Sequence, residues 1–145
     1  MTGTAGLIDA IVQAPDAHAA MQVAVERLKA LPNYNWVGIY LLEGQELVLG
    51  PFLGKPSPHT RIPLNRGICG AAASQKETII VDDVNSDPRY LACSIETKSE
   101  IVVPIMRDGR VFGEIDIDSD RPAAFGEQDR KLLEDAARAI ANRLD

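Results

Sequence analysis

The segment from Glu114 to Asp118 alternates acidic and apolar residues in the order Glu-Ile-Asp-Ile-Asp. Successive side chains of a β-strand point to opposite faces, so this alternation predicts a strand with two different faces. Ile115 and Ile117 would anchor one face on a core, while Glu114, Asp116 and Asp118 line the other. A chain with such a strand is constrained to a sheet that buries its apolar face and carries a row of carboxyl groups on the opposite face.

The remaining chain switches between helical and strand-like periods, which predicts an α+β fold. We expect helices at residues 7–13, 17–31 (capped by Asp16), 67–75 and 126–144, and strands at residues 35–42, 47–52, 78–84, 99–106 and 110–118. Residues 54–65 are expected to form a loop. The predicted sheet is antiparallel, with helices packed on one face. The long connection at residues 85–98 would cross the other face, where a pocket between loop and sheet is the natural ligand site.

Whether Glu100 joins the acidic row depends on the register of the last hairpin. A three-residue turn over residues 107–109, with glycine at its third position, is favoured and pairs Met106 with Arg110. It places Glu100 directly opposite Asp116, whereas a strict two-residue turn would put Glu100 on the apolar face. Like charges side by side in a sheet cost energy, so such a cluster favours a cationic ligand. The alternative is that these acids simply face water.

The chain contains two cysteines, Cys69 and Cys93. Cys69 begins a predicted helix directly after Gly67, where free amide groups and the helix dipole favour a thiolate. Cys93 falls in the long loop, where we expect it to be accessible. Both could instead be buried, inert core residues, as free cysteines often are. In a reducing compartment a lasting structural disulfide is not expected, so a working pair would be redox-active.

Composition excludes several classes of function. The 145 residues fit a single domain, 1–145, and the net charge of −6 argues against nucleic acid as a partner. No apolar run suits a membrane span, and the first residues lack the features of a signal peptide, so we expect a cytoplasmic protein. The two histidines and two cysteines lack metal-ligand spacing, and no phosphate-binding loop is present, so neither a metal nor an organic cofactor is expected.

Trp36 and Tyr40 lie four residues apart and therefore on the same face of a predicted strand. Such a pair is either part of the core or an apolar wall for a small ligand. His59 lies in a proline-rich segment and is either a surface residue or close to the ligand site.

Several segments, in collinear order, resemble the free methionine-(R)-sulfoxide reductases, which are small stand-alone GAF-domain enzymes. They are residues 36–42, 49–55, 66–70, 99–105 and 116–119, together with the phrase around Cys93. The resemblance implies a GAF-like fold, often as a homodimer, with a ligand pocket under loops. It also implies free methionine-(R)-sulfoxide as the substrate and a role under oxidative stress.

Residue by residue, the resemblance implies unequal roles for the two cysteines. Cys93 matches the nucleophile and would become a sulfenic acid. Cys69 matches a resolving cysteine, and the resulting Cys69–Cys93 disulfide would be reduced by a thioredoxin-like dithiol. The carboxylates that hold the substrate and assist proton transfer match Glu100, Asp116 and Asp118, with Asp118 as the proton donor. The aromatic wall around the methyl-sulfinyl group matches Trp36 and Tyr40.

Two positions depart from the family pattern. His59 stands where the family commonly has a third cysteine, and Ser94 replaces an acid that usually follows the nucleophile. These changes bear on how the disulfide is recycled. Two alternatives of other classes stay open at this point: a GAF domain that binds a small molecule as a sensor without chemistry, and a purely structural or dimerisation module.

Overall fold

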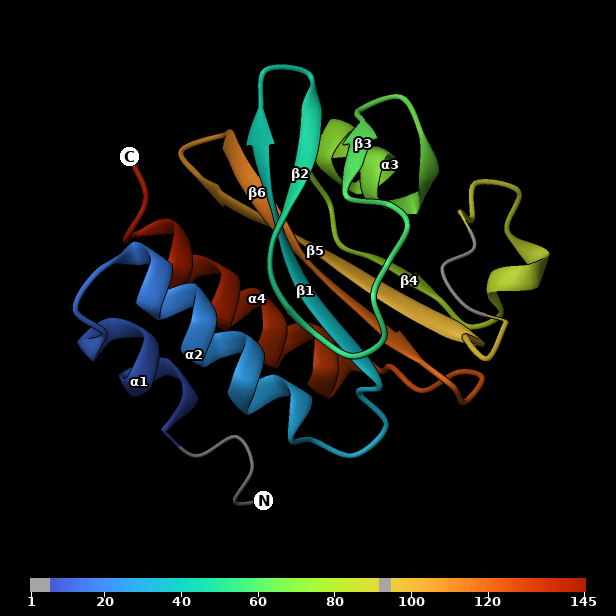
Figure 1. Cartoon of the computed structure of the whole chain (residues 1–145), viewed down its shortest axis with the longest axis horizontal. Coiled ribbons are helices and arrows are strands. Elements are labelled where there is room, and N and C mark those ends of the chain that lie inside the picture. Colours follow the sequence, from blue (N-terminus) through green and yellow to red (C-terminus); the bar gives the residue numbers. More distant parts are fainter. Residues whose placement is uncertain (1–5, 92–94) are drawn as a thin grey trace.

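The computed structural model describes residues 6–91 and 95–145, and within them the chain folds as one antiparallel sheet with helices on both faces (Figure 1). The strand order is β3-β2-β1-β6-β5-β4. The strands are β1 (Trp36–Glu43), β2 (Glu46–Leu53), β3 (Arg61–Pro63), β4 (Ile79–Val81), β5 (Ser99–Arg107) and β6 (Arg110–Ser119). The helices are α1 (Leu7–Gln13), α2 (Ala17–Lys29), α3 (Gly67–Gln75) and α4 (Glu127–Ala141). The α+β class and the predicted helices and hairpins are thereby confirmed.

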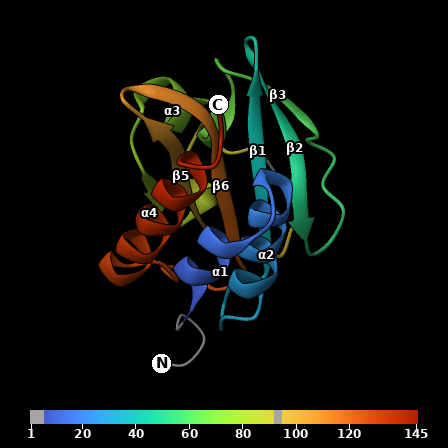
Figure 2. The same cartoon turned by 90° about the vertical axis from the view of Figure 1, so that its left-hand side faces the viewer.

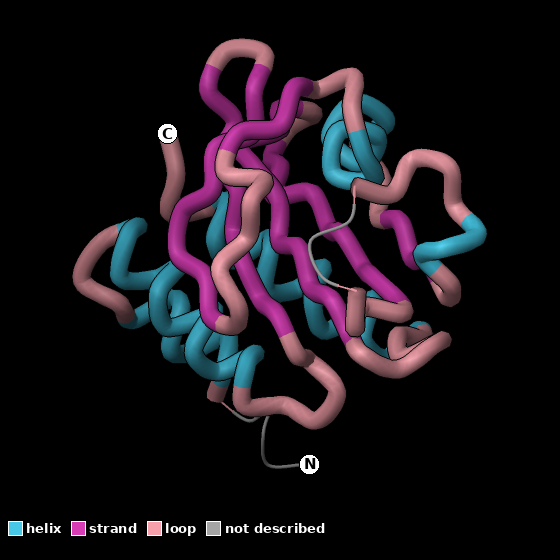
Figure 3. The backbone as a smooth tube through the Cα atoms, turned by 45° about the vertical axis from the view of Figure 1, so that its right-hand side comes forward, coloured by secondary structure: helices cyan, strands magenta, loops and turns pink. Residues whose placement is uncertain are grey.

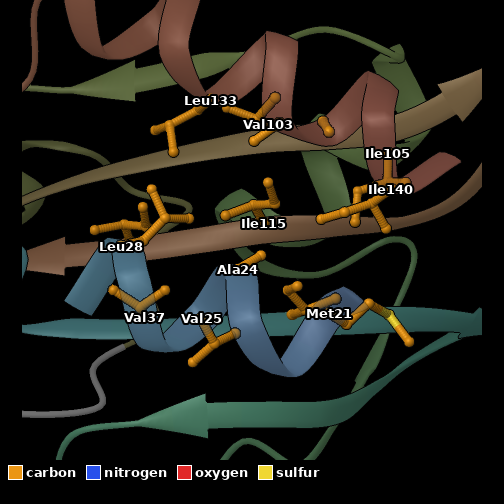
Figure 4. Close-up of a cluster of buried hydrophobic side chains, with 14 of the residues drawn as sticks. Met21, Ala24, Val25, Leu28, Val37, Val103, Ile105, Ile115, Leu133 and Ile140 are labelled. Atoms are coloured by element: carbon orange, nitrogen blue, oxygen red, sulfur yellow. The ribbon is translucent and has the colours of Figure 1, made fainter. Parts of the chain in front are cut away.

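Helices α1, α2 and α4 gather on one side of the sheet (Figure 2). The Asp16 side chain accepts a hydrogen bond from the Ala19 amide at 2.8 Å, so it caps α2 as its sequence position predicts. Helices α2 and α4 pack their apolar stripes onto the apolar face of the sheet, where Ile115 is fully buried (Figure 4), and α1 packs against these two helices. Burial of each large apolar side chain contributes about 1.5–3 kcal/mol, and this layer is the main core.

The short helix α3 lies on the opposite face of the sheet, the face that the sequence assigned to loops (Figure 3). Its residues Ile68 and Cys69 pack against Tyr40 of β1 and Val102 of β5 in a second, smaller cluster of buried side chains. Two faces of one sheet therefore bury side chains, and the acidic row of β6 lies in the smaller layer.

Two connections differ from their sequence expectations. The segment 54–65 contains strand β3, in which Ile62 pairs with Leu47 and is almost fully buried. Three residues that end at a proline carry too little strand periodicity to be recognised in isolation. Strand β4 is shorter than predicted, because the chain turns into a single 3₁₀ turn, η2 (Val84–Ser86), that is capped by the side chain of Asp83.

The register of the β5–β6 hairpin corrects the predicted turn. Asp108 and Gly109 both have positive φ, 54° and 79°, and Arg107 pairs directly with Arg110 across a two-residue turn. A bulge then shifts the pairing by one residue between Ile105 and Met106.

Because of this shift, Glu100 lies opposite Asp118, and the predicted pairing of Glu100 with Asp116 is wrong. The predicted face is nevertheless right. A two-residue turn followed by a one-residue bulge leaves Glu100 on the same face of the sheet as a three-residue turn would.

Among the described residues, no helix combines the length and the apolar character needed to cross a bilayer.

Candidate active site

The described part of the chain buries four acidic side chains, and all of them lie on the α3 side of the sheet. Glu114 is 0% exposed, Asp116 and Asp118 are each 3% exposed, and Glu100 of β5 is 5% exposed. The alternation along β6 puts the first three on one face, and the β5–β6 register brings Glu100 beside them. The alternative, in which these acids simply face water, is excluded because all four are buried.

Strand β1 supplies the aromatic neighbours of this row. Trp36 pairs with Asp118 and Tyr40 pairs with Glu114 on the adjacent strand. Between them, Gly38 pairs with Asp116 and adds no side chain. Each end of the acidic row is therefore flanked by an aromatic residue.

The same two aromatic residues fasten the segment between β2 and β3 over the site. The Trp36 indole Nε1 donates to the Lys55 carbonyl at 2.8 Å, and the Tyr40 hydroxyl donates to the His59 carbonyl at 2.7 Å. Trp36 also stacks on Phe52, with ring centroids 5.8 Å apart. These contacts bring His59 to the site, so of the two alternatives for this residue the structure supports the second.

Cys69 lies in the first turn of α3, and its side chain is directed at the acids. It is 5% exposed, and its Sγ atom donates to Oδ2 of Asp116 at 3.4 Å. Gly67, with φ of +73°, starts the helix, and a Cβ there would lie 2.8 Å from Leu91 Cδ1. Glycine at this position therefore lets Leu91 close over the first turn of α3.

The predicted acidity of Cys69 is wrong. Burial is the largest effect and raises the pKa of the Cys69 thiol well above its ordinary value, and the neighbouring acids Asp116, Glu114 and Glu100 raise it further. The partial positive charge of a helix terminus is small compared with desolvation plus several nearby acids. Cys69 is therefore a protonated thiol at neutral pH.

The four carboxyl groups do not share one electrostatic environment. Burial raises the pKa of Glu100, Glu114 and Asp118 well above the ordinary range, so these groups hold protons. Burial also raises the pKa of Asp116, but hydrogen bonds from Glu100 and Cys69 and the nearby His59 oppose the rise. Asp116 is therefore the member of the cluster best suited to carry the negative charge.

Two cavities are each lined in part by residues of the acidic row. The inner one, of about 20 Å³, is lined by Tyr40, His59, Ile62, Gly67, Ile68, Cys69, Leu91, Glu100 and Asp116. The outer one, of about 120 Å³, is lined by Asn35, Trp36, Lys55, Pro56, Glu96, Thr97, Asp118 and Asp120. Lys55 and Glu96 form an exposed ion pair of 2.5 Å across the outer cavity. A larger groove of about 520 Å³ beside α4 contains none of the predicted site residues.

The structure thus brings together six of the seven residues singled out from the sequence. Tyr40, Cys69, Glu100 and Asp116 line the inner cavity, and Trp36 and Asp118 line the outer one. Cys93 lies outside the described residues, as does the predicted Cys69–Cys93 pair. Sequence reasoning did not select Glu114 for the site, although the alternation that selected Asp116 and Asp118 places it on the same face.

Donor atoms of Cys69, Glu100 and Asp116 lie within 4.8 Å of one another. A thiol and two carboxyl groups at this spacing offer oxygen and sulfur donors to a cation, and an organic ammonium group can use the same oxygens. The expectation that the protein needs no metal stays a prediction.

Comparison with known proteins supports one family. The model of the GAF domain family matches residues 16–144. A free methionine-R-sulfoxide reductase of Saccharomyces cerevisiae (strain ATCC 204508 / S288c) is 45% identical over 127 residues, which cover 85% of this chain and 66% of that protein.

Solved structures agree with this result. A type II free methionine-R-sulfoxide reductase from Thermoplasma acidophilum has 43% identity and a TM-score of 0.84, covering 87% of this chain and 90% of that one. The free methionine-R-sulfoxide reductase from Neisseria meningitidis, solved in complex with its substrate, has 37% identity and a TM-score of 0.90, covering 97% and 84%. The chain belongs to the GAF domain family and, within it, to the free methionine-R-sulfoxide reductases, which are oxidoreductase enzymes.

Proposed function

We propose that this protein reduces free L-methionine-(R)-sulfoxide to methionine with its two cysteines. The observation that carries the proposal is the buried row of carboxyl groups beside Cys69, flanked by two aromatic side chains. Buried acids without a cation are costly, so the site favours a ligand that brings positive charge. The names of the relatives and the substrate complex of the Neisseria meningitidis enzyme support the same substrate.

The substrate's ammonium group forms an ion pair with Asp116 and donates a hydrogen bond to Glu100. Asp116 carries the negative charge of the cluster, so it provides the ion pair. The methyl-sulfinyl end packs on Trp36 and Tyr40. Since a cavity of about 20 Å³ holds little more than a water molecule, the amino acid reaches the acids only when the covering loops separate.

In the first chemical step, the Cys93 thiolate attacks the sulfoxide sulfur. Asp118, which holds a proton because burial raises its pKa, protonates the sulfoxide oxygen and makes it a better leaving group. The attack forms a bond between the two sulfur atoms. This bond and the S–O bond of the substrate then break as the protonated oxygen moves to the cysteine sulfur. Methionine sulfur gains two electrons, and Cys93 loses two and becomes a sulfenic acid.

In the second step, Cys69 attacks the sulfur of the Cys93 sulfenic acid. The S–H proton of Cys69 passes to Asp116, an S–S bond forms, and the sulfenic oxygen leaves as water after it takes up the proton. The hydrogen bond from Cys69 to Asp116 supports this route. A thioredoxin-like dithiol then reduces the disulfide by thiol–disulfide exchange, which restores both thiols.

The proposal is tested with the purified 145-residue chain and separate epimers of free methionine sulfoxide. With a chemical dithiol, we expect the R epimer to be reduced and the S epimer to be left intact. Cys93→Ser should abolish turnover. Cys69→Ser should keep turnover with the chemical dithiol and lose it with thioredoxin.

Several outcomes would contradict the assignment. Equal rates for the two epimers would reject the proposed substrate geometry, and activity that survives in Cys93→Ser would reject the nucleophile. Binding of methionine sulfoxide without any turnover would favour the alternative of a sensor domain. Absence of both binding and thiol reactivity would favour a structural module.

A further inference from the structure

The inner cavity contains a set of donor atoms that suits a metal ion as well as a substrate. One ligand atom from each of Cys69, Glu100 and Asp116 lies within 4.8 Å of the other two, and all three side chains are buried. The three residues come from α3, β5 and β6, so tertiary packing brings them together. A thiol sulfur and carboxyl oxygens are ligands that Zn²⁺ binds in proteins.

Asp116 gives an independent indication that a ligand binds here. Its side chain is 3% exposed and lines the inner cavity. Oδ2 accepts the hydrogen bond from Cys69, whereas the buried Oδ1 has no hydrogen-bond partner among the residues that the structure describes. Burying a carboxyl oxygen without a partner costs free energy, so this oxygen favours a ligand that brings a cation or a donor to it.

The distances and the size of the cavity suit a single ion. With a Zn–S bond of about 2.3 Å and a Zn–O bond of about 2.0–2.2 Å, two such ligands at a tetrahedral angle lie about 3.5 Å apart. The Sγ atom of Cys69 and Oδ2 of Asp116 are 3.4 Å apart. The cavity of about 20 Å³ has room for little more than a water molecule. In this closed arrangement it therefore favours an ion over an amino acid.

The thiol decides which cation fits best. Mg²⁺ and Ca²⁺ prefer oxygen ligands and take six or more of them, and an organic ammonium group gains little from a sulfur atom. Zn²⁺ binds thiolate and carboxylate ligands together and needs only four. Cys69, Glu100 and Asp116 provide three, and a water molecule can complete the tetrahedron.

We propose that the inner cavity is a zinc site, in which Cys69, Glu100 and Asp116 bind the ion and the bound ion keeps the reductase inactive. Binding breaks the S–H bond of Cys69 and the O–H bond of Glu100, and both protons leave to solvent. Three anionic ligands then face two positive charges, so the ion offsets most of the buried negative charge. It also occupies the carboxylate that would pair with the substrate's ammonium group. The inhibition rests on the proposed function, whereas the metal site does not.

The test uses Cys93→Ser as background, because Cys69 is then the one remaining thiol of the chain. Reduced, metal-free protein is titrated with Zn²⁺ against a chromophoric chelator, and bound zinc is counted by elemental analysis. Co²⁺ serves as a spectroscopic substitute for zinc, because a Co²⁺–thiolate bond gives a charge-transfer band in the near ultraviolet. This band reports the Cys69 ligand without any substitution in the inner cavity.

Three variants are compared in this background: Cys69→Ser, Asp116→Asn and the control Asp82→Asn. Asp82 is exposed and lines a separate cavity together with Asp83 and Asp87, where zinc bound merely at the surface would sit. The melting temperature of each variant shows whether it is folded.

We expect one zinc ion per chain and a Co²⁺–thiolate band in the background protein. Zinc should bind at least about 100-fold more weakly to Cys69→Ser and Asp116→Asn, because even the loss of an outer partner of a metal ligand costs about 10- to 100-fold. Asp82→Asn should bind zinc as tightly as the background protein. Absence of the band, or unchanged zinc affinity in Cys69→Ser, would overturn the proposal. Loss of zinc binding in Asp82→Asn would overturn it too, because it would place the ion at the surface.

Inhibition is measured with both cysteines present, in a single turnover without a dithiol, because dithiols themselves bind zinc. One equivalent of Zn²⁺ should abolish the release of methionine, and a chelator should restore it. Release that bound zinc leaves unchanged would overturn the inhibition. A protein that binds zinc through Cys69 but releases no methionine even without the metal would reject the proposed function and leave the metal site standing.

Discussion

The Cys69 thiol donates a hydrogen bond to Asp116, with Sγ and Oδ2 3.4 Å apart, although 47 positions separate the two residues in the chain. This contact joins the first turn of α3 to the middle of β6. In the proposed reaction, Asp116 has two partners in succession, the substrate's ammonium group and the proton of the resolving thiol. The predictions below follow from that arrangement and from the packing that holds it.

The variant Asp116→Asn should bind the substrate more weakly. The amide keeps the shape of the side chain but removes the negative charge that pairs with the ammonium group, so we expect kcat/KM to fall about 10- to 100-fold, mainly through KM. Steady-state kinetics with free methionine-(R)-sulfoxide check this. Asp82→Asn, the same change at an exposed acid, is the control and should behave as the wild type. An unchanged KM in Asp116→Asn would remove this residue from the binding site.

Substitutions of Trp36 should lower the stability of the fold, and the fluorescence of Trp36 should report substrate binding. Trp36→Phe removes the hydrogen bond to the Lys55 carbonyl and should cost about 1 kcal/mol of unfolding free energy. Trp36→Ala also removes the stack on Phe52 and should cost about 3–5 kcal/mol. Urea titrations measure both values.

Since Trp36 is the only tryptophan, substrate should change the protein's intrinsic fluorescence. Fluorescence that stays unchanged at saturating substrate would mean that the ligand does not bind beside Trp36.

Gly113→Ala should destabilise the centre of the sheet. A Cβ at this position would lie 2.1 Å from the Tyr40 carbonyl oxygen, and a backbone atom in a paired strand cannot move aside cheaply. We expect a loss of about 2–3 kcal/mol of unfolding free energy. Gly126→Ala is the matched control, because nothing lies within 4 Å of a Cβ there and φ is −123°. Equal stability of the two variants would show that β1 and β6 are not paired as described.

The buried acids should make the free protein less stable as the pH rises. Burial raises the pKa of Glu100 and Glu114 above the ordinary value of 4.5 and that of Asp118 above 3.8. At a pH between the ordinary pKa and the raised pKa of such a group, the folded chain therefore binds more protons than the unfolded chain. The stability that these groups contribute is complete below the ordinary pKa and is lost as the pH rises through the raised one. We expect the melting temperature to fall from pH 5 to pH 8.

The variant Glu114→Gln should remove the contribution of one buried acid to this pH dependence of stability. The variant has no ionisable group at the position, so its melting temperature should fall less steeply than that of the wild type over the same range. Subtracting the two curves removes the contributions to the pH dependence that the two proteins share. Parallel curves for the two proteins would mean that Glu114 does not titrate between the folded and unfolded states in this range.

The hairpin of β5 and β6 shows how far sequence reasoning reaches. The pattern around Asp108 and Gly109 predicted a turn, and the period of two predicted which residues share a face. The number of residues in the turn and the bulge beside Met106 follow from contacts with neighbouring strands, so the sequence predicted the face of Glu100 correctly and its partner incorrectly. Strand β3 was missed for a related reason, because three residues show no period and depend on β2 for pairing.

Local sequence thus determined the order of helices and strands, the alternating faces of β6 and the residues that resemble a reductase site. These are properties of near neighbours in the chain, whose spacing is set by backbone geometry. Only the tertiary structure decided that Cys69 is a buried thiol beside Asp116, that His59 reaches the site and that Glu114 is fully buried. Protonation and hydrogen bonding depend on the full three-dimensional surroundings of a group, because desolvation and the nearby charges come from segments that are distant in sequence.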